Sequence, residues 1–176
     1  MEDNKQKKKK KKKLRKSQKY TIIFFAFMLA IFLIQQINIR YNQSPITMHP
    51  ETEKYEVVFR YIHDGDTAVF MDKNTKEDII CRFLAVDSPE IDEEGYEEAK
   101  EYTKNCLSNA RNIVLELDPY SDKYDKYQRL LAWVWIDGQL LQAKLLENDL
   151  ANIRYVYNDY LYTAYLNKIV KQNVTE

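Results

Sequence analysis

Cysteine and histidine are scarce in this chain of 176 residues, which has two of each. None of the paired Cys/His spacings that hold zinc is present, so a zinc finger or a thiolate-bound cluster is excluded. Cys81 lies in a strand-like apolar run and Cys106 in a helix-like one, and both are expected to be buried free thiols. Oxidation to a disulfide in an exported domain is the alternative, but spacing alone gives no geometry for it.

The chain also lacks a net charge, because two oppositely charged parts cancel. Residues 1–19 contain ten lysines and one arginine against Glu2 and Asp3, a net charge of +9. Residues 41–176 carry 15 basic and 25 acidic side chains, a net charge of −10. A domain this acidic is not suited to grip a polyanion over a broad surface. If it binds nucleic acid, a bound cation and a few local arginines must make the contacts.

Uninterrupted apolar sequence is short, about 15 residues from Tyr20 to Ile34, whereas a membrane span needs roughly 20. Extension to Ile39 through the polar residues that follow reaches that length, so residues 20–39 are predicted to be an uncleaved transmembrane signal anchor. The basic tail, residues 1–19, is then expected to be disordered and cytoplasmic, with the C-terminal domain outside the cell membrane. A cleaved secretory signal and a nuclear or nucleic-acid-binding tail are the alternatives.

Residues 40–53 are polar, contain two prolines and are predicted to link this anchor to a domain at residues 54–172. Runs rich in β-branched and aromatic residues predict five strands, at residues 55–62, 67–72, 79–86, 112–118 and 130–136. Helical spacing of apolar residues predicts three helices, at residues 97–110, 140–150 and 158–171. Trp133 and Trp135 are expected on opposite faces of their strand, with at most one fully in the core. The pattern is typical of an α+β, mainly β fold: a five-stranded barrel of the oligonucleotide-binding (OB) type.

Five charged residues stand near predicted strand ends, in HDGDT (63–67), CRFLAVDSPE (81–90) and DKYQRLLAWVW (125–135). They are Asp66, Arg82, Asp87, Glu90 and Arg129. Carboxylates hold hard cations through oxygen, guanidinium groups grip phosphate oxygens, and a further carboxylate can deprotonate an attacking water. Each motif alone is weak, because Asp-Gly hairpin turns and surface charges are common. Together they are the groups that metal-assisted cleavage of a phosphodiester needs.

These segments resemble the staphylococcal nuclease (thermonuclease) family, and the resemblance covers about residues 55–171. The shared motifs are DGDT at 64–67, R-x3-VD-S-PE at 82–90, EA-x2-YTK at 98–104, DKY-x-R-L-x-A at 125–132 and YVY at 155–157. Five spaced matches in one order are specific, whereas any single one is not. The resemblance implies an OB-fold barrel and a calcium-dependent nuclease that acts on DNA and RNA with little sequence preference and leaves 3′-phosphate ends.

The resemblance also implies a role for each matching residue. Asp66 and Asp87 would bind Ca²⁺ through their carboxylates, and Ser88 through its main-chain carbonyl. Arg82 and Arg129 would bind the scissile phosphate and stabilise the transition state, while Glu90 would activate or orient water. The terminal phosphate and a stacked base would be contacted by Lys126, Tyr127, Tyr155 and Tyr157.

Three departures from the family pattern affect the expected site. Ser88 replaces the usual threonine, a small change if only the carbonyl is used. Gln128 and Leu130 flank Arg129 where the staphylococcal enzyme has glycines, so this loop is expected to be stiffer. Residues 91–95 replace a longer basic loop with a short acidic one. The tyrosine excess, 14 residues, is attributed to core and surface packing rather than to a stacking platform.

The sequence therefore predicts a single-pass, membrane-anchored, calcium-dependent nuclease whose substrates are DNA and RNA, preferably single-stranded or locally open. No obligate protein partner is expected. The main rival is a catalytically inactive OB-fold module that binds nucleic acid at the membrane. The full set of five charged residues favours the enzyme, because a pure binder gains nothing from buried carboxylates that repel phosphate. An acidic membrane adaptor is a third alternative, supported only by the charge of −10.

Overall fold

The computed structural model describes residue 20, residues 23–31 and residues 46–173. The chain divides into two units, Met1–Pro45 and Ile46–Glu176. In the first unit, residues 23–31 are helical, while the predicted tail at 1–19 and half of the predicted anchor at 20–39 lie outside the described residues. Among the residues described, no helix has the length and apolar content needed to cross a membrane.

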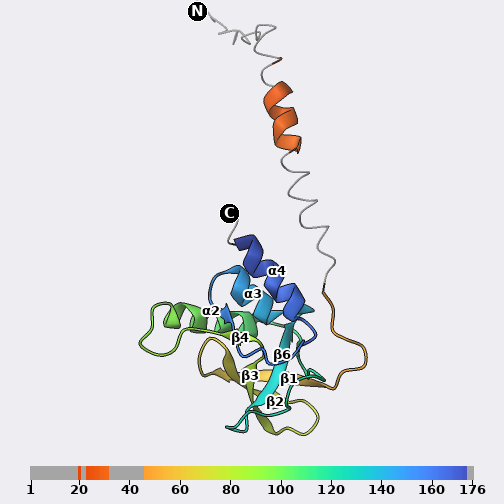
Figure 1. Cartoon of the computed structure of the whole chain (residues 1–176), viewed down its shortest axis with the longest axis vertical. Coiled ribbons are helices and arrows are strands. Elements are labelled where there is room, and N and C mark those ends of the chain that lie inside the picture. The colour runs from red at the N-terminus through yellow and green to blue at the C-terminus, as the bar shows by residue number, and fades with distance from the viewer. Residues whose placement is uncertain (1–19, 21–22, 32–45, 174–176) are drawn as a thin grey trace, which may run out of the picture. The chain divides into compact units, whose positions relative to one another are not determined.

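The second unit is built on a closed five-stranded barrel (Figure 1). Its strands are β1 (Lys54–Ile62), β2 (Thr67–Asp72), β3 (Asp78–Phe83), β5 (Ile113–Glu116) and β6 (Leu130–Ile136). They follow the antiparallel order β3-β2-β1-β5-β6, and a parallel pairing of β3 with β6 closes the barrel. Closure leaves no free strand edge, which is how small barrels avoid edge-to-edge association. The predicted OB-type barrel is therefore present.

Three helices and three two-residue strands complete the unit. The helices are α2 (Tyr96–Asn109), α3 (Leu141–Glu147) and α4 (Thr163–Asn173). The short strands are β4 (Val86–Asp87), β7 (Gln139–Leu140) and β8 (Asn152–Ile153), and β4 pairs with β8. Figure 1 shows α3 and α4 together at one end of the barrel, with β2 near the opposite end. The buried residues of α4, Leu166 and Ile169, join the same hydrophobic core as Leu145 and Leu146 of α3.

Both tryptophans of β6 are buried, which corrects the prediction that at most one lies in the core. Trp133 and Trp135 are 0% and 1% exposed, and both rings contact Tyr162, with centroids 5.2 and 5.4 Å away. Residues two apart in a strand share a face, so the expectation of opposite faces was wrong. Their indole N–H groups are satisfied inside, because Trp133 donates to Asp118 at 2.8 Å and Trp135 donates to Glu116 at 2.7 Å.

Glu116 also draws the segment before β1 onto the barrel. This fully buried carboxylate accepts hydrogen bonds from the main-chain N–H of His49 at 2.8 Å and from Tyr162 at 2.9 Å. Leu117 donates its N–H to the carbonyl of Glu53 at 2.9 Å. Residues 46–53, assigned to the linker from sequence, are thus part of the second unit.

The third predicted strand, 79–86, is interrupted in the structure. β3 ends at Phe83, and β4 begins at Val86 after a turn in which Ala85 has a φ of 62°. The guanidinium of Arg82 stabilises this turn, since Nη1 donates to the carbonyls of Phe83 at 2.8 Å and Val86 at 2.6 Å. The break turns Asp87 back toward Arg82, which a continuous strand would not do.

Candidate functional site

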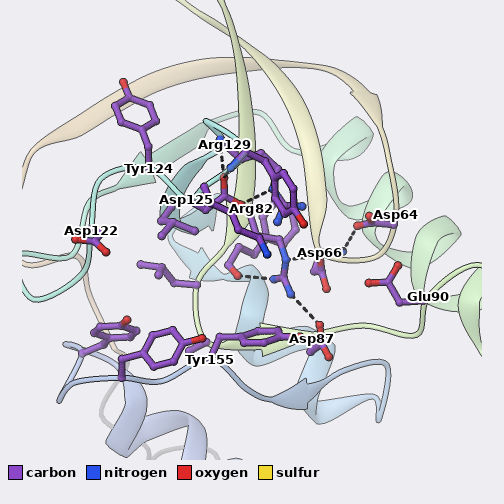
Figure 2. Close-up of a pocket in the computed structure, with 18 residues that line it drawn as sticks. Asp64, Asp66, Arg82, Asp87, Glu90, Asp122, Tyr124, Asp125, Arg129 and Tyr155 are labelled. Atoms are coloured by element: carbon purple, nitrogen blue, oxygen red, sulfur yellow. Dashed lines mark hydrogen bonds and ion pairs between the residues drawn. The ribbon is translucent and has the colours of Figure 1, made fainter.

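A cavity of about 640 Å³ opens beside the barrel and contains most of the residues expected to act on a substrate. Its walls come from the β1–β2 turn, the β3–β4 turn, the loop before β6 and the segment before α4 (Figure 2). Nine of the ten predicted site residues line it: Asp66, Arg82, Asp87, Glu90, Lys126, Tyr127, Arg129, Tyr155 and Tyr157. Ser88, the tenth, lies directly behind Asp66 and lines a smaller adjoining hollow.

The β1–β2 turn that carries Asp66 is packed tightly against α2. A Cβ on Gly65 would lie 2.7 Å from Cβ of Ser88 and 2.9 Å from Cβ of Ala99, so only glycine fits there. Thr103 of α2 donates its hydroxyl to the Gly65 carbonyl at 2.7 Å. The EA-x2-YTK motif of the sequence therefore has a physical role, because it fastens the turn to the helix.

Asp66 is buried, with 4% of its surface exposed, and it is held in a fixed orientation. Its Oδ2 accepts hydrogen bonds from the main-chain N–H of Ser88 at 2.7 Å and from the Ser88 hydroxyl at 3.1 Å. Its Oδ1 lies 3.0 Å from Nε of Arg82. Burial raises the pKa of Asp66 to about 6, against the opposing effect of the Arg82 charge.

Arg82 joins the two carboxylates that the resemblance assigns to a cation. While Nε faces Asp66, Nη2 donates to Oδ1 of Asp87 at 2.9 Å. The two main-chain bonds of Nη1 fix the guanidinium plane, so Nε and Nη2 form a paired edge that faces the two carboxylates. Bidentate recognition of an oxyanion uses such a paired edge of an arginine.

The donor set around Asp66 suits a hard cation. Asp66 and Asp87 are carboxylates turned toward one positive group, and the buried charge of Asp66 would be stabilised by a cation at this position. Across the part of the chain that the structure describes, no group of three or more His, Cys, Asp or Glu side chains is arranged to hold a metal. The predicted calcium ligands include only two such side chains, Asp66 and Asp87, because the third ligand is the main-chain carbonyl of Ser88.

Arg129 reaches the same cavity from a tight loop that Asp125 organises. Oδ2 of Asp125 accepts from Nε of Arg129 at 2.7 Å, and Oδ1 accepts from the Arg129 main-chain N–H at 2.9 Å. Nη1 of Arg129 lies 3.5 Å from the hydroxyl of Thr67, next to Asp66. These bonds from Arg129 lower the pKa of Asp125, although burial alone would raise it. Gln128 occupies the left-handed region with a φ of 63°, a conformation that glycine adopts at lower steric cost.

Aromatic rings flank both arginines. The Tyr127 ring centroid lies 5.4 Å from Cζ of Arg129 and 4.9 Å from Nζ of Lys126. The Tyr155 ring centroid lies 5.7 Å from Cζ of Arg82. Tyr127, Tyr155 and Tyr157 are 67%, 55% and 78% exposed, so their rings are available to a ligand. Tyr155 adopts a φ of 57°, which bends the chain there.

Glu90 lies on the rim of the cavity and is exposed. Its main-chain N–H bonds to the carboxylate of Glu93 at 2.8 Å, which closes the short acidic loop against it. Figure 2 shows Glu90 on the same side of the cavity as Asp64, Asp66 and Asp87. The rim position leaves the carboxylate open to solvent water.

Sequence reasoning missed Asp125, Thr103 and Arg154 as parts of this site. The four-residue spacing of Asp125 and Arg129 is a pattern from which their pairing could have been inferred. Thr103 and Gly65 are 38 residues apart, and no local pattern connects them. Arg154 places Nε 3.8 Å from Oδ2 of Asp87, opposite Arg82, which only the pairing of β4 with β8 brings about.

Comparison with known proteins agrees with this geometry. The chain is 36% identical to "Endonuclease YncB" of Bacillus subtilis (strain 168) over 127 residues, which are 66% of this chain and 59% of that protein. It is 37% identical to "SPbeta prophage-derived endonuclease YokF" of the same organism over 99 residues, 53% of this chain and 32% of that protein. The chain thus spans well under two thirds of either endonuclease.

A staphylococcal protein is matched over more of its length. "Thermonuclease" of Staphylococcus hyicus is 27% identical over 153 residues, which are 82% of this chain and 88% of that protein. Residues 80–173, more than half of the chain, match the family described as "Staphylococcal nuclease homologue". This chain therefore belongs to the family of staphylococcal nuclease homologues.

Proposed function

We propose that the chain is a calcium-dependent nuclease that hydrolyses phosphodiester bonds of DNA and RNA. The observation that carries the proposal is the convergence of Arg82, Asp66 and Asp87 in one cavity with Arg129 and Glu90. A cavity that combines two oriented arginines with buried carboxylates suits a phosphate anion and a cation together. The endonuclease and thermonuclease names of its relatives support the same reaction class.

The residues that would hold Ca²⁺ are Asp66 and Asp87 through carboxylates and Ser88 through its main-chain carbonyl. When bound, the ion would neutralise charge on the phosphate oxygens and act as a Lewis acid. Ser88 has a second contribution in this chain, since its N–H and hydroxyl already orient Asp66. The serine at this position therefore does more than supply a carbonyl.

The two arginines would grip the scissile phosphate from different elements. Arg82 has its plane fixed by the β3–β4 turn, and Arg129 is fixed by Asp125. Preorganised donors of this kind stabilise the extra negative charge of a pentacovalent transition state without having to reorient. Glu90, on the open rim, would take the proton of the attacking water.

Single-stranded or locally open nucleic acid is the proposed substrate, with little sequence preference and 3′-phosphate products. Lys126 and Tyr127 would contact a terminal phosphate, and Tyr155 and Tyr157 would stack on a base. The rings are accessible only to bases that are not already stacked in a duplex. Phosphate and stacking contacts of this type do not read base edges, which accounts for the expected lack of sequence preference.

The deciding experiment mixes the purified full-length protein with single-stranded DNA, RNA and plasmid, in calcium or in excess chelator. We expect cleavage in calcium, none in chelator, and 3′-phosphate ends detected by end-specific labelling. Asp66→Asn and Glu90→Gln should each reduce the rate at least a hundredfold, whereas Asp78→Asn, a carboxylate paired with Arg60 on the barrel exterior, should not. Undiminished activity in chelator, or binding without cleavage, would reject the proposal; the second result would identify the inactive binding module.

We further propose that residues 20–39 anchor the protein in the cell membrane, with its N-terminus cytoplasmic and the nuclease domain outside. Support comes from the sequence: a run of apolar residues follows a tail with a net charge of +9. In intact cells, external protease should remove the domain from residue 46 onward and spare the lysine-rich tail. A protected C-terminal tag would reverse this orientation, and a soluble secreted form beginning near residue 40 would indicate a cleaved signal.

A further inference from the structure

The cavity continues beyond the residues assigned above. Tyr124, Asp122 and Tyr160 also line it, and none of them has a role in the proposed reaction. Figure 2 shows Tyr124 and Asp122 on the side of the cavity away from Asp66, Asp87 and Glu90. Five of the 14 tyrosines line this one cavity.

The ring of Tyr124 has no aromatic, cationic or hydrogen-bonding partner among residues 46–173. It is 49% exposed, and within residues 46–173 it takes part in no aromatic pair, cation–π contact or side-chain hydrogen bond. The other cavity tyrosines contrast with it, since Tyr127 packs against Arg129 and Tyr155 packs against Arg82. A large half-exposed ring at a cavity wall is free to contact a ligand without first breaking an internal contact.

The backbone around Tyr124 is nevertheless fixed. Tyr124 forms an antiparallel bridge with Leu130, and Leu131 donates its N–H to the carbonyl of Lys123 at 3.0 Å. Asp125, the next residue, anchors Arg129. The ring is therefore attached to the same rigid loop that positions a proposed phosphate-binding arginine, which keeps the two at a constant separation.

The part of the cavity wall next to Tyr124 is also preorganised, through Asp118. Its Oδ1 accepts from the N–H of Tyr120 at 2.9 Å, and its Oδ2 accepts from the N–H of Leu161 at 2.8 Å. Asn158 donates its side-chain amide to the carbonyl of Tyr120 at 2.9 Å. These bonds join the loop that carries Asp122 to the segment that carries Tyr160. Because these segments are already ordered, ligand binding beside them would cost little conformational entropy.

The charges near Tyr124 disfavour a phosphate group but are compatible with a nucleobase. Asp122 is exposed and negatively charged, so it repels the strand backbone. Lys123, the neighbouring cation, is directed elsewhere, because Nζ bonds to Glu53 at 3.0 Å and lies 5.4 Å from the Tyr55 ring centroid. A neutral aromatic group that stacks on Tyr124 and can donate a hydrogen bond to Asp122 fits both features.

We propose that Tyr124 and Asp122 form a second nucleobase subsite, which stacks a base further along the strand than the one beside Tyr155 and Tyr157. Tyr160, which is only 6% exposed, supports the cavity wall there and is not a stacking surface. The proposal rests on the nuclease function given above and extends it to the length of strand that the site recognises. The subsite is filled only by a substrate with at least one nucleotide beyond those at the scissile phosphate. It makes the protein prefer longer single strands.

The test uses single-stranded oligodeoxynucleotides with one normal phosphodiester between uncharged methylphosphonate linkages, so that cleavage occurs at one position. Substrates are lengthened one nucleotide at a time on either side of that bond, and kcat/KM is measured for the full-length protein in calcium. Wild type should gain about five- to 150-fold in kcat/KM at the length that fills the subsite, the range expected for one stacked base.

Three variants separate stacking from other effects. Tyr124→Ala should abolish the gain, mainly through KM, and leave the dinucleotide rate unchanged. Tyr124→Phe should retain the gain because the ring remains. Tyr61→Ala removes a tyrosine of β1 that is 54% exposed and does not line the cavity, and it should behave as wild type.

An abasic nucleotide at the outer position provides the complementary change in the substrate. With that substrate, wild type and Tyr124→Ala should have equal kcat/KM. An equal effect of Tyr124→Ala on substrates of all lengths, or a length gain that survives the substitution, would overturn the subsite. If wild type cleaves none of the oligonucleotides, the nuclease proposal itself fails, and that result is distinct from a missing length gain.

Discussion

Asp125 binds Arg129 through two separate groups, accepting from its side-chain Nε at 2.7 Å and from its main-chain N–H at 2.9 Å. One carboxylate thereby sets both the conformation of the loop and the direction of the guanidinium. The i, i+4 spacing is one that commonly pairs side chains on helices, but here it closes a turn that also receives the N–H of Tyr127 at 2.9 Å.

Replacing Asp125 with asparagine should therefore lower kcat at least tenfold, because Arg129 loses its charged partner and is no longer preorganised.

The substitution of Asp125 by asparagine should also reduce stability in a pH-dependent manner. The pKa of Asp125 is lowered in the folded protein, so its stabilisation is present above the ordinary carboxyl pKa of about 3.9 and is lost as pH falls through the lowered value. Urea unfolding at pH 7 and near pH 3 should show a gap between wild type and variant that narrows at the lower pH. A gap that widens there would contradict the pairing.

Arg82→Lys should lower kcat by about a hundredfold or more, although the charge is kept. Lysine lacks the planar fork, and it cannot donate to Phe83, Val86 and both carboxylates together. Steady-state kinetics gives the rate, and circular dichroism confirms that the barrel is folded. Arg60→Lys, at an exposed ion pair with Asp78, is the matched control and should have no effect. Near-normal turnover of Arg82→Lys would rule out the proposed clamp.

Gly65→Ala should destabilise the protein by about 1–3 kcal/mol, because the added methyl group overlaps Ser88 and Ala99. Since Asp66 is the next residue, activity should fall as well. Gly138→Ala provides the comparison: its Cβ would meet nothing within 4 Å, and only its φ of +80° opposes alanine. That control should lose stability through backbone strain and keep its activity. Chemical denaturation and initial rates measure the two effects, and equal activity losses in both variants would show that the Gly65 packing is unimportant to the site.

Gln128→Gly should raise the free energy of unfolding by up to about 1 kcal/mol, since glycine adopts a φ of 63° without steric cost. The same change removes the stiffness expected of this loop, so Arg129 should become less well held and kcat should fall. Asn74→Gly, in another turn and outside the left-handed region, should lose stability instead. Thermal unfolding of wild type, Gln128→Gly and Asn74→Gly ranks their stabilities. Destabilisation by Gln128→Gly would show that the glutamine side chain itself stabilises the folded loop.

Cleavage at subsaturating substrate should first rise and then fall as salt is added at fixed calcium. The domain carries a net charge of −10, so screening initially helps a polyanion approach. Higher salt then weakens the few contacts of Lys126, Arg82 and Arg129 by counterion release. Initial rates over an ionic-strength series measure the peak. A steep fall from the lowest salt onward would mean a broader basic binding surface than the structure contains in its described part.

The local pattern of residues determined the strands and most of the site chemistry. The bounds predicted for β2 and β6, 67–72 and 130–136, are those observed, because each run of apolar residues is terminated by turn-forming residues such as Asp64-Gly65 and Asp137-Gly138. The DGDT, R-x3-VD-S-PE, DKY-x-R and YVY motifs identified nine residues that line the cavity, because the chemistry of their side chains can be recognised from the sequence.

The tertiary structure alone decided how those groups are held and what lies beside them. The contact of Thr103 with Gly65 and the approach of Arg154 to Asp87 both depend on segments that are distant in sequence. Burial of both tryptophans required Glu116 and Asp118 to satisfy their indole N–H groups. Likewise, Tyr124 is one tyrosine among 14 in the sequence, and only closure of the barrel brings it to the cavity wall. Periodicity reports which face a residue occupies, but the partner on that face is set by long-range packing.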